Sequence, residues 1–205
     1  GRIGRLIETH GIFVLGLREW CALNLFAGCH DLRQREEAAY QAGVGANERA
    51  SIEETFRLLD ACGFSRTADA DLYRALDLMI AGSTFDARPP PGGAAFNAAE
   101  LVQSGGAMAA QLAQKLDKHS PGWREDAGMV QAHALALVAA DLDTANVAEP
   151  FLRFAGSAEN LCLEREMLCQ RDLDASPSAK PVLDFLTDGQ QRFFFELHRF
   201  NSELG

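Results

Sequence analysis

The closing segment constrains the folding of this chain more than any other, because it gathers aromatic side chains at helical spacing. Apolar residues recur there at i, i+4, i+7 and i+11, the spacing of one α-helical face: Phe193, Leu197, Phe200 and Leu204. Phe194 and Phe195 widen that face beyond a narrow stripe. A helix this aromatic has to bury itself in a core, against a partner or against a ligand.

Local helix signals recur along the rest of the chain. Ser51-Ile52-Glu53-Glu54 has the pattern of a capping box, which predicts the start of a helix at Ser51. Gly63 occupies the position that ends this helix, and Phe64 falls where a Schellman motif places an apolar contact with Leu59. The sequence contains no alternating β-branched run. It therefore predicts an all-α fold, a mostly antiparallel multi-helix bundle of about eight to nine helices.

The first long helix, predicted from about residue 11 to residue 27, is apolar around most of its circumference. Such a helix belongs in the middle of a bundle or in an oligomer interface. Its apolar part, residues 12–26, also carries Arg18, Glu19 and Asn24. A membrane span needs about 20 apolar residues, so this segment predicts a buried helix and no membrane partner.

The length of 205 residues fits one domain, and we predict a single helical domain over residues 1–205. Three prolines and two glycines interrupt the helical pattern in Arg88-Pro89-Pro90-Pro91-Gly92-Gly93. This break predicts a Pro/Gly-rich surface loop at about residues 86–96. The pattern then resumes, predicting a helix from about residue 97 to residue 118 and another that begins at Ser120-Pro121.

The apolar faces of the predicted helices identify a candidate core. Its members share inward-facing positions at helical spacing, and we expect them to be buried. They are Trp20, Phe26, Phe56, Leu59, Leu76, Leu112, Leu137, Leu168, Phe193, Leu197 and Phe200.

The excess of acidic residues indicates which classes of partner the chain can bind. Lysine and arginine total 19 against 29 aspartate and glutamate, a formal net charge of -10. Such a chain repels phosphate backbones and anionic membrane surfaces, so we expect no nucleic acid to bind it.

The five cysteines form no tight disulfide framework, and their odd number favours a reducing compartment. Cys162 and Cys169 lie seven residues apart on a predicted helix, which separates their Cα atoms by roughly 10 Å, too far for a bridge. We predict five reduced thiols and a cytoplasmic protein.

Catalytic signatures are absent from the sequence. It contains no phosphate-binding glycine motif, no nucleophile elbow and no C-x-x-C pair. Helical bundles that hold di-iron sites use Glu-x-x-His, and this spacing does not occur either. The sequence identifies neither catalytic nor metal-binding residues, and any cofactor remains unknown.

The first and last predicted helices carry more apolar surface than one core-facing stripe requires. We predict that they jointly form a dimer interface or an apolar pocket, since aromatic anchors dominate interfaces. His198 follows Phe194 by four residues and shares its side of the helix, an environment suited to a flat aromatic ligand or haem. The candidate ligand or interface residues are Phe13, Leu17, Trp20, Phe194, Phe195 and His198.

These observations favour a helical ligand-binding or regulatory interaction module that is homo-oligomeric and non-catalytic. Its partners would be a second copy of the chain or an apolar small molecule. One alternative is a helical-bundle enzyme whose haem or metal is bound by scattered ligands. Another is the effector-binding half of a transcriptional regulator that lacks its DNA reader.

Overall fold

The computed structural model describes residues 1–33, 46–83, 85–87, 102–107, 109–168, 180 and 182–205. Most of these residues are helical, which confirms the predicted all-α multi-helix bundle. The longer helices are α1 (Arg2–His10), α2 (Leu17–Cys29), α4 (Ala46–Ala61), α5 (Ala70–Ser83), α7 (Ala109–His119), α8 (Ala127–Thr144) and α9 (Phe151–Leu168). Short 3₁₀ turns are η1 (Ile12–Val14), η2 (Trp123–Glu125) and η3 (Ala145–Ala148).

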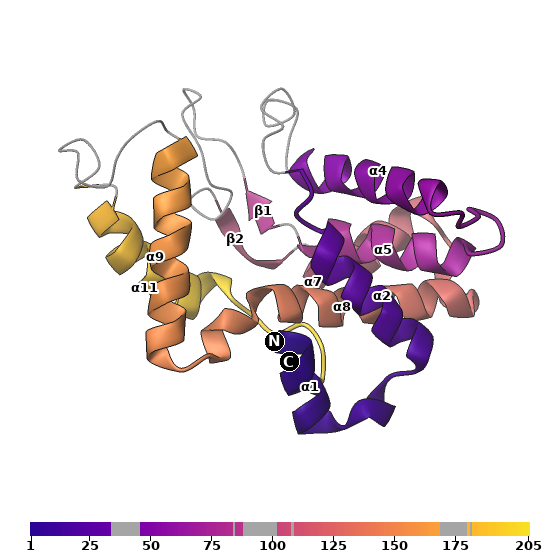
Figure 1. Cartoon of the computed structure of the whole chain (residues 1–205), viewed down its shortest axis with the longest axis horizontal. Coiled ribbons are helices and arrows are strands. Elements are labelled where there is room, and N and C mark those ends of the chain that lie inside the picture. Colours follow the sequence, from indigo (N-terminus) through magenta and orange to yellow (C-terminus); the bar gives the residue numbers. More distant parts are fainter. Residues whose placement is uncertain (34–45, 84, 88–101, 108, 169–179, 181) are drawn as a thin grey trace.

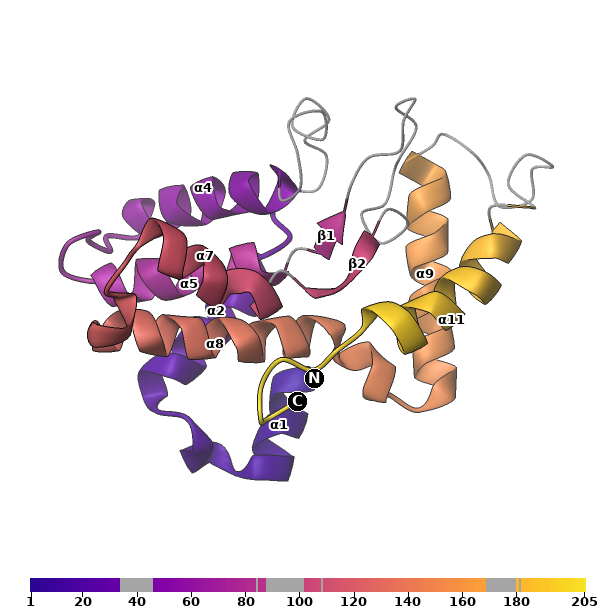
Figure 2. The same cartoon turned by 180° about the vertical axis from the view of Figure 1, so that it is seen from behind.

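Helices α5 and α8 form the centre of the bundle. Helices α4, α2 and α7 pack around this pair, and the views from both sides show α4, α5 and α8 in successive layers (Figures 1 and 2). Helix α1 lies below α8, close to both ends of the chain (Figure 1). Helix α9 stands at one end of α8, so the fold has a helical core and a smaller helical extension.

Small residues allow the central helices to approach closely. Ala136 and Ala139 of α8 are fully buried, as are Leu76 and Met79 of α5. A Cβ atom built on Gly82 would lie 3.0 Å from Leu112 Cδ1, so a side chain at this position would meet α7. The alanine-rich sequence of α8 therefore fits a helix that is surrounded by neighbours on most sides.

The capping box predicted a helix start at Ser51, but α4 begins at Ala46 and Ser51 lies inside it, with its hydroxyl bonded to the Arg33 backbone. The end of α4, in contrast, follows the sequence prediction. Gly63 has a φ of 90°, in the left-handed region that favours glycine. Its amide donates to Asp60 O at 3.1 Å, and the Phe64 amide donates to Leu59 O at 3.1 Å. These two bonds are the paired hydrogen bonds of a Schellman motif.

The start of α8 differs from the prediction. The helix expected from Ser120-Pro121 begins at Ala127 instead, after the η2 turn. Asp126 caps it by accepting hydrogen bonds from the amides of Gly128 and Met129 at 2.9 and 3.2 Å. The carboxylate satisfies amide groups that the first helical turn leaves free, which makes Asp126 a stronger start signal than the proline.

Two short strands were not expected. Strands β1 (Phe85–Ala87) and β2 (Val102–Ala107) form an antiparallel pair, with Phe85 opposite Ala107. The helix predicted from residue 97 was therefore wrong over 102–107, where two consecutive glycines have low helix propensity. The Pro/Gly-rich loop predicted at about 86–96 has residues 86 and 87 in β1, and its remainder lies outside the described residues.

The predicted core is confirmed in its central part. Trp20, Phe26, Leu59, Leu76 and Leu112 are buried. The half-buried residues are Phe56, Leu137 and Phe193. The side chains of Leu168 and Leu197 lie outside the part that the structure describes.

Phe200 was predicted to be buried, but 48% of its surface is exposed. The predicted last helix ends earlier than its apolar spacing suggested. It consists of the π-helical turns η4 (Phe185–Gly189) and η5 (Phe193–Leu197), joined by the short α11 (Gln190–Arg192). His198 is extended, with φ −71° and ψ 134°, so Phe200 and Leu204 belong to a non-helical tail.

Candidate functional site

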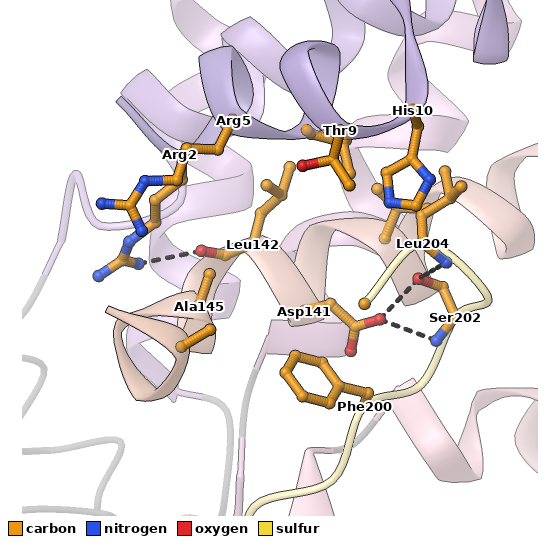
Figure 3. A pocket seen from close by; sticks show the side chains of 14 residues that line it. Arg2, Arg5, Thr9, His10, Asp141, Leu142, Ala145, Phe200, Ser202 and Leu204 are labelled. Carbon is orange, nitrogen blue, oxygen red and sulfur yellow. Dashed lines mark hydrogen bonds between the residues drawn. The ribbon is translucent and has the colours of Figure 1, made fainter. Parts of the chain in front are cut away.

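A pocket of about 270 Å³ lies where α1, the end of α8 and the C-terminal tail meet (Figure 3). Helix α1 contributes residues 2, 5, 6 and 9, which recur at i, i+3, i+4 and i+7 and so share one helical face. Residues 138, 141, 142 and 145 do the same on α8 and its continuation in η3. The non-helical tail contributes residues 200, 202, 204 and 205. Two helical faces and the non-helical tail therefore build the pocket.

Asp141 fixes the tail in place. Its side chain is buried, with 4% of the residue surface exposed. Oδ1 accepts hydrogen bonds from the backbone and side-chain amides of Asn201 at 2.7 and 3.0 Å. Oδ2 accepts from the Ser202 amide at 2.8 Å and from the Ser202 hydroxyl at 2.6 Å (Figure 3). Four donors thus satisfy this buried carboxylate, and the tail becomes a wall of the pocket.

Two arginines of α1 supply positive charge at the pocket. Arg2 Nη1 donates to Leu142 O at 3.0 Å and also to Asp143 O, which are carbonyls in the last turn of α8. A cation is favourable there because the C-terminal end of a helix carries partial negative charge. Arg5 Nη2 lies 4.0 Å from Glu149 Oε1. This distance is too long for a hydrogen bond.

The remaining walls are mostly apolar. They come from all three segments of the pocket: Leu6, Val138, Leu142, Ala145, Ala148, Phe200 and Leu204. Leu6 and Val138 belong to the buried core, and Leu142 and Leu204 pack against it. The pocket therefore combines an apolar floor with charged groups at a few positions, the usual composition of a small-molecule site.

His198 stabilises the junction between η5 and the tail. Thr144 Oγ1 donates to Ala140 O at 3.1 Å, so the same hydroxyl accepts a hydrogen bond from His198 Nε2 at 3.1 Å. The imidazole packs edge-on against the Phe200 ring, with centroids 4.8 Å apart. Burial lowers the pKa of His198, which favours the neutral form. His198 therefore acts on the pocket through Phe200 and does not line it.

The structure places the candidate residues of the first predicted helix in two environments. Phe13 and Leu17 lie at the corner between α1 and α2, and 97% and 80% of their surfaces are exposed. Trp20 is buried, and its Nε1 donates to Ile12 O at 2.7 Å. Trp20 thus holds the corner from inside, while Phe13 and Leu17 face outward.

The candidate residues of the last helix lie elsewhere. The Phe194 ring packs edge-on against Phe154 of α9, with centroids 4.7 Å apart, and 76% of the Phe195 surface is exposed. The segment that carries them lies beside α9, whereas η1 lies beyond the far end of α1, and both views show the two regions apart (Figures 1 and 2). Within one copy of the chain, these two groups do not form a continuous surface.

A charged histidine at the end of α2 is the clearest electrostatic feature outside the pocket. His30 Nε2 lies 3.2 Å from both Asp31 and Asp143, and Nδ1 lies 3.1 Å from Phe26 O. Burial acts to lower the pKa of His30, but the hydrogen bonds and charges of the two aspartates outweigh burial and raise it to about 10. Among the described residues, no group of three or more His, Cys, Asp and Glu side chains has an arrangement that could hold a metal ion.

Sequence reasoning named Phe200 and Leu204 but missed the polar residues of the pocket. The pocket residues recur at i, i+3, i+4 and i+7 in each of two helices, a spacing that is visible in the sequence. Arg2, Asp141 and Ser202 are polar, however, so a search for apolar helical faces does not find them. Their meeting depends on contacts across 140 residues of sequence, such as that of Arg2 with Leu142.

Neither a protein-family model, nor a curated protein, nor a solved structure matches this chain. Across the described part of the chain, the helices are too short or too polar to cross a bilayer. The geometry of the pocket is therefore the basis for a functional interpretation.

Proposed function

We propose that the chain is a non-catalytic, helical ligand-binding module whose site is the pocket between α1, α8 and the tail. The observation that carries this proposal is the pocket itself, about 270 Å³ in volume and lined mainly by apolar residues from three distant segments. Pockets of this composition bind small molecules through apolar contact and use a few polar groups for orientation. If the chain is the effector-binding half of a transcriptional regulator, the same pocket would be its effector site.

The contacts of the polar residues favour binding over catalysis. Ser202, His10 and Asp141 all line the pocket, but Ser202 Oγ donates directly to Asp141. In a hydrolase triad the histidine lies between the serine and the aspartate and removes the proton. Here the carboxylate holds the tail, while His10 lies on the α1 wall (Figure 3).

The pocket volume also argues against the haem alternative. An apolar cavity of about 150 Å³ takes a benzene ring. A pocket of about 270 Å³ is therefore suited to a two-ring compound or a chain of similar size, and a haem is much larger. His198, the residue considered for haem, uses Nε2 to donate to Thr144.

The test uses 1-aminonaphthalene, an uncharged two-ring fluorophore whose emission shifts to the blue in an apolar site. Ala145 lines the pocket, so Ala145→Phe should fill it and abolish the shift. Ala134→Phe is the matched control, because Ala134 is exposed on α8 and does not line the pocket. Equal binding by the wild type and Ala145→Phe would refute the pocket as the site.

The exposed corner favours a second function, self-association. Phe13, Leu17 and Ile12 are exposed at neighbouring positions, and exposed apolar patches often mark interaction sites. Phe13→Asp should then lower the mass in sedimentation equilibrium without lowering the melting temperature. Phe195→Asp tests the apolar surface beside α9 in the same way. A wild type that sediments as a monomer would refute self-association.

We propose a reducing, cytoplasmic location. Cys21 and Cys62 are exposed and lie outside any disulfide, and Cys29 is also unbridged. Exposed thiols persist where glutathione and thioredoxin keep them reduced. Fractionation of the source cells that recovered the chain outside the cytoplasm would contradict this location.

A further inference from the structure

The charges at the pocket are unevenly distributed. Arg2 and Arg5 lie three residues apart on the same face of α1, and both line the pocket. Asp141 carries the only carboxylate side chain among the lining residues. Because four donors already satisfy Asp141, it has little capacity left to attract a cation.

The two arginines differ in how many of their hydrogen-bond donors are already used. Arg2 is held by two carbonyls of α8, so its position is fixed and part of its donor capacity is used. Arg5 faces Glu149 at 4.0 Å, a distance at which charge attraction is present but no hydrogen bond forms. A carboxylate in the pocket would offer Arg5 hydrogen bonds at shorter range than Glu149 does, and Arg2 would add charge beside it.

The apolar walls define the rest of the ligand. Leu6 and Val138 belong to the core behind the pocket, and Leu142 and Leu204 complete this surface. By comparison with benzene in a cavity of about 150 Å³, the volume of about 270 Å³ has room for roughly ten non-hydrogen atoms. That size fits a monocarboxylic acid of about eight carbons, with the carboxyl carbon included.

We infer that the pocket selects a small amphipathic carboxylic acid, with its carboxylate at Arg5 and Arg2 and its apolar body against the leucine and valine walls. This inference rests on the proposed ligand-binding function and adds the ligand class. Arg5 is the residue that distinguishes an acid from a neutral molecule of the same length. Arg2 also supports the end of α8, so Arg5 is the better residue to test.

The test compares octanoate with 1-octanol by isothermal titration, because the two share one chain length and differ in charge. The wild type should bind octanoate at least tenfold more tightly than octanol. Arg5→Gln should weaken octanoate binding about tenfold, the loss expected of one charge-assisted hydrogen bond at a half-exposed site, and leave octanol within about twofold. Arg18→Gln removes an exposed arginine outside the pocket and should change neither affinity.

The outcomes separate the inference from the proposed function. Equal affinities for octanoate and octanol, both lost in Ala145→Phe, would overturn the acid preference and leave a binding pocket. An acid preference that persists in Arg5→Gln would overturn the assignment to Arg5. Binding of neither compound, with no response to 1-aminonaphthalene, would overturn both. Arg5→Lys serves as a folding check, since it keeps the charge and should retain part of the acid preference.

Discussion

Replacing Asp141 with asparagine should detach the C-terminal tail from α8. The buried carboxylate accepts two hydrogen bonds on each oxygen, from Asn201 and from Ser202. Asparagine has nearly the same shape but only one acceptor oxygen. Whichever way its amide is turned, the NH₂ group faces two donors of the tail in place of an acceptor. The substitution therefore removes one pair of bonds without creating a cavity.

The size of the effect follows from these bonds. A hydrogen bond to a charged group contributes about 1.5–3 kcal/mol. Asn201 and Ser202 are half-buried, so water can replace part of what is lost, and the low end of that range applies. Two lost bonds then lower the free energy of unfolding by about 3 kcal/mol. Solvent screens this loss little at the carboxylate itself, because only 4% of the Asp141 surface is exposed.

Urea denaturation measures this loss, and limited trypsin digestion reports on the tail. Arg199 is exposed in the tail, so its release should accelerate cleavage after this residue. Glu8→Gln is the control, because it makes the same change of charge at an exposed position on α1. A loss below about 1 kcal/mol with unchanged cleavage would show that Asp141 does not hold the tail.

Four further measurements test other parts of the fold. Leu76→Ala should lower the free energy of unfolding by about 2–5 kcal/mol, because this side chain is fully buried between α5 and its neighbours. Gly63→Ala should cost about 1–2 kcal/mol in the same assay, since φ at this position is 90°. The folded state raises the pKa of His30 from 6.5 to about 10, so the stabilisation by this residue is complete below pH 6.5 and is lost as the pH rises through about 10. Between pH 7 and about 10, the His30→Gln variant should therefore lose less stability than the wild type. Labelling of denatured, unreduced protein should find five thiols.

Local signals predicted several parts of the fold correctly, although the Ser51 capping box did not mark the start of α4, which begins at Ala46. The end of α4 is the clearest case, because Gly63, Phe64 and Leu59 lie within six positions and their bonds follow from backbone geometry alone. The buried faces of α2, α4 and α5 were also predicted through Trp20, Leu59 and Leu76. Each of these residues sits on a stripe whose period is set by the helix itself.

The tail shows where such reasoning fails. Phe200 continued the apolar spacing of Phe193, yet the helix stops at Leu197 and the chain becomes extended. Bonds from residues 201 and 202 to Asp141, about 60 positions earlier, hold the tail in this form. Helical periodicity carries no information about a partner so distant in sequence. The tertiary contacts with Asp141 therefore overrode the local helical preference of the tail.

The same distinction explains why the pocket escaped prediction. Each helical face of the pocket mixes apolar and charged positions, so neither is a pure stripe, and a charged face on a surface helix ordinarily meets solvent. The proposed role of Arg5 rests on its distance from Glu149 and on its sharing a pocket with Leu6 and Leu142, both of which depend on the packing of α1 against the end of α8. Arg2 contributes to that packing through a contact with α8 that spans 140 positions. The placement of positive charge at an apolar pocket thus arises only when the helices are assembled. The comparison of octanoate with 1-octanol tests the effect of this charge directly, because it changes the charge of the ligand and leaves the protein unchanged.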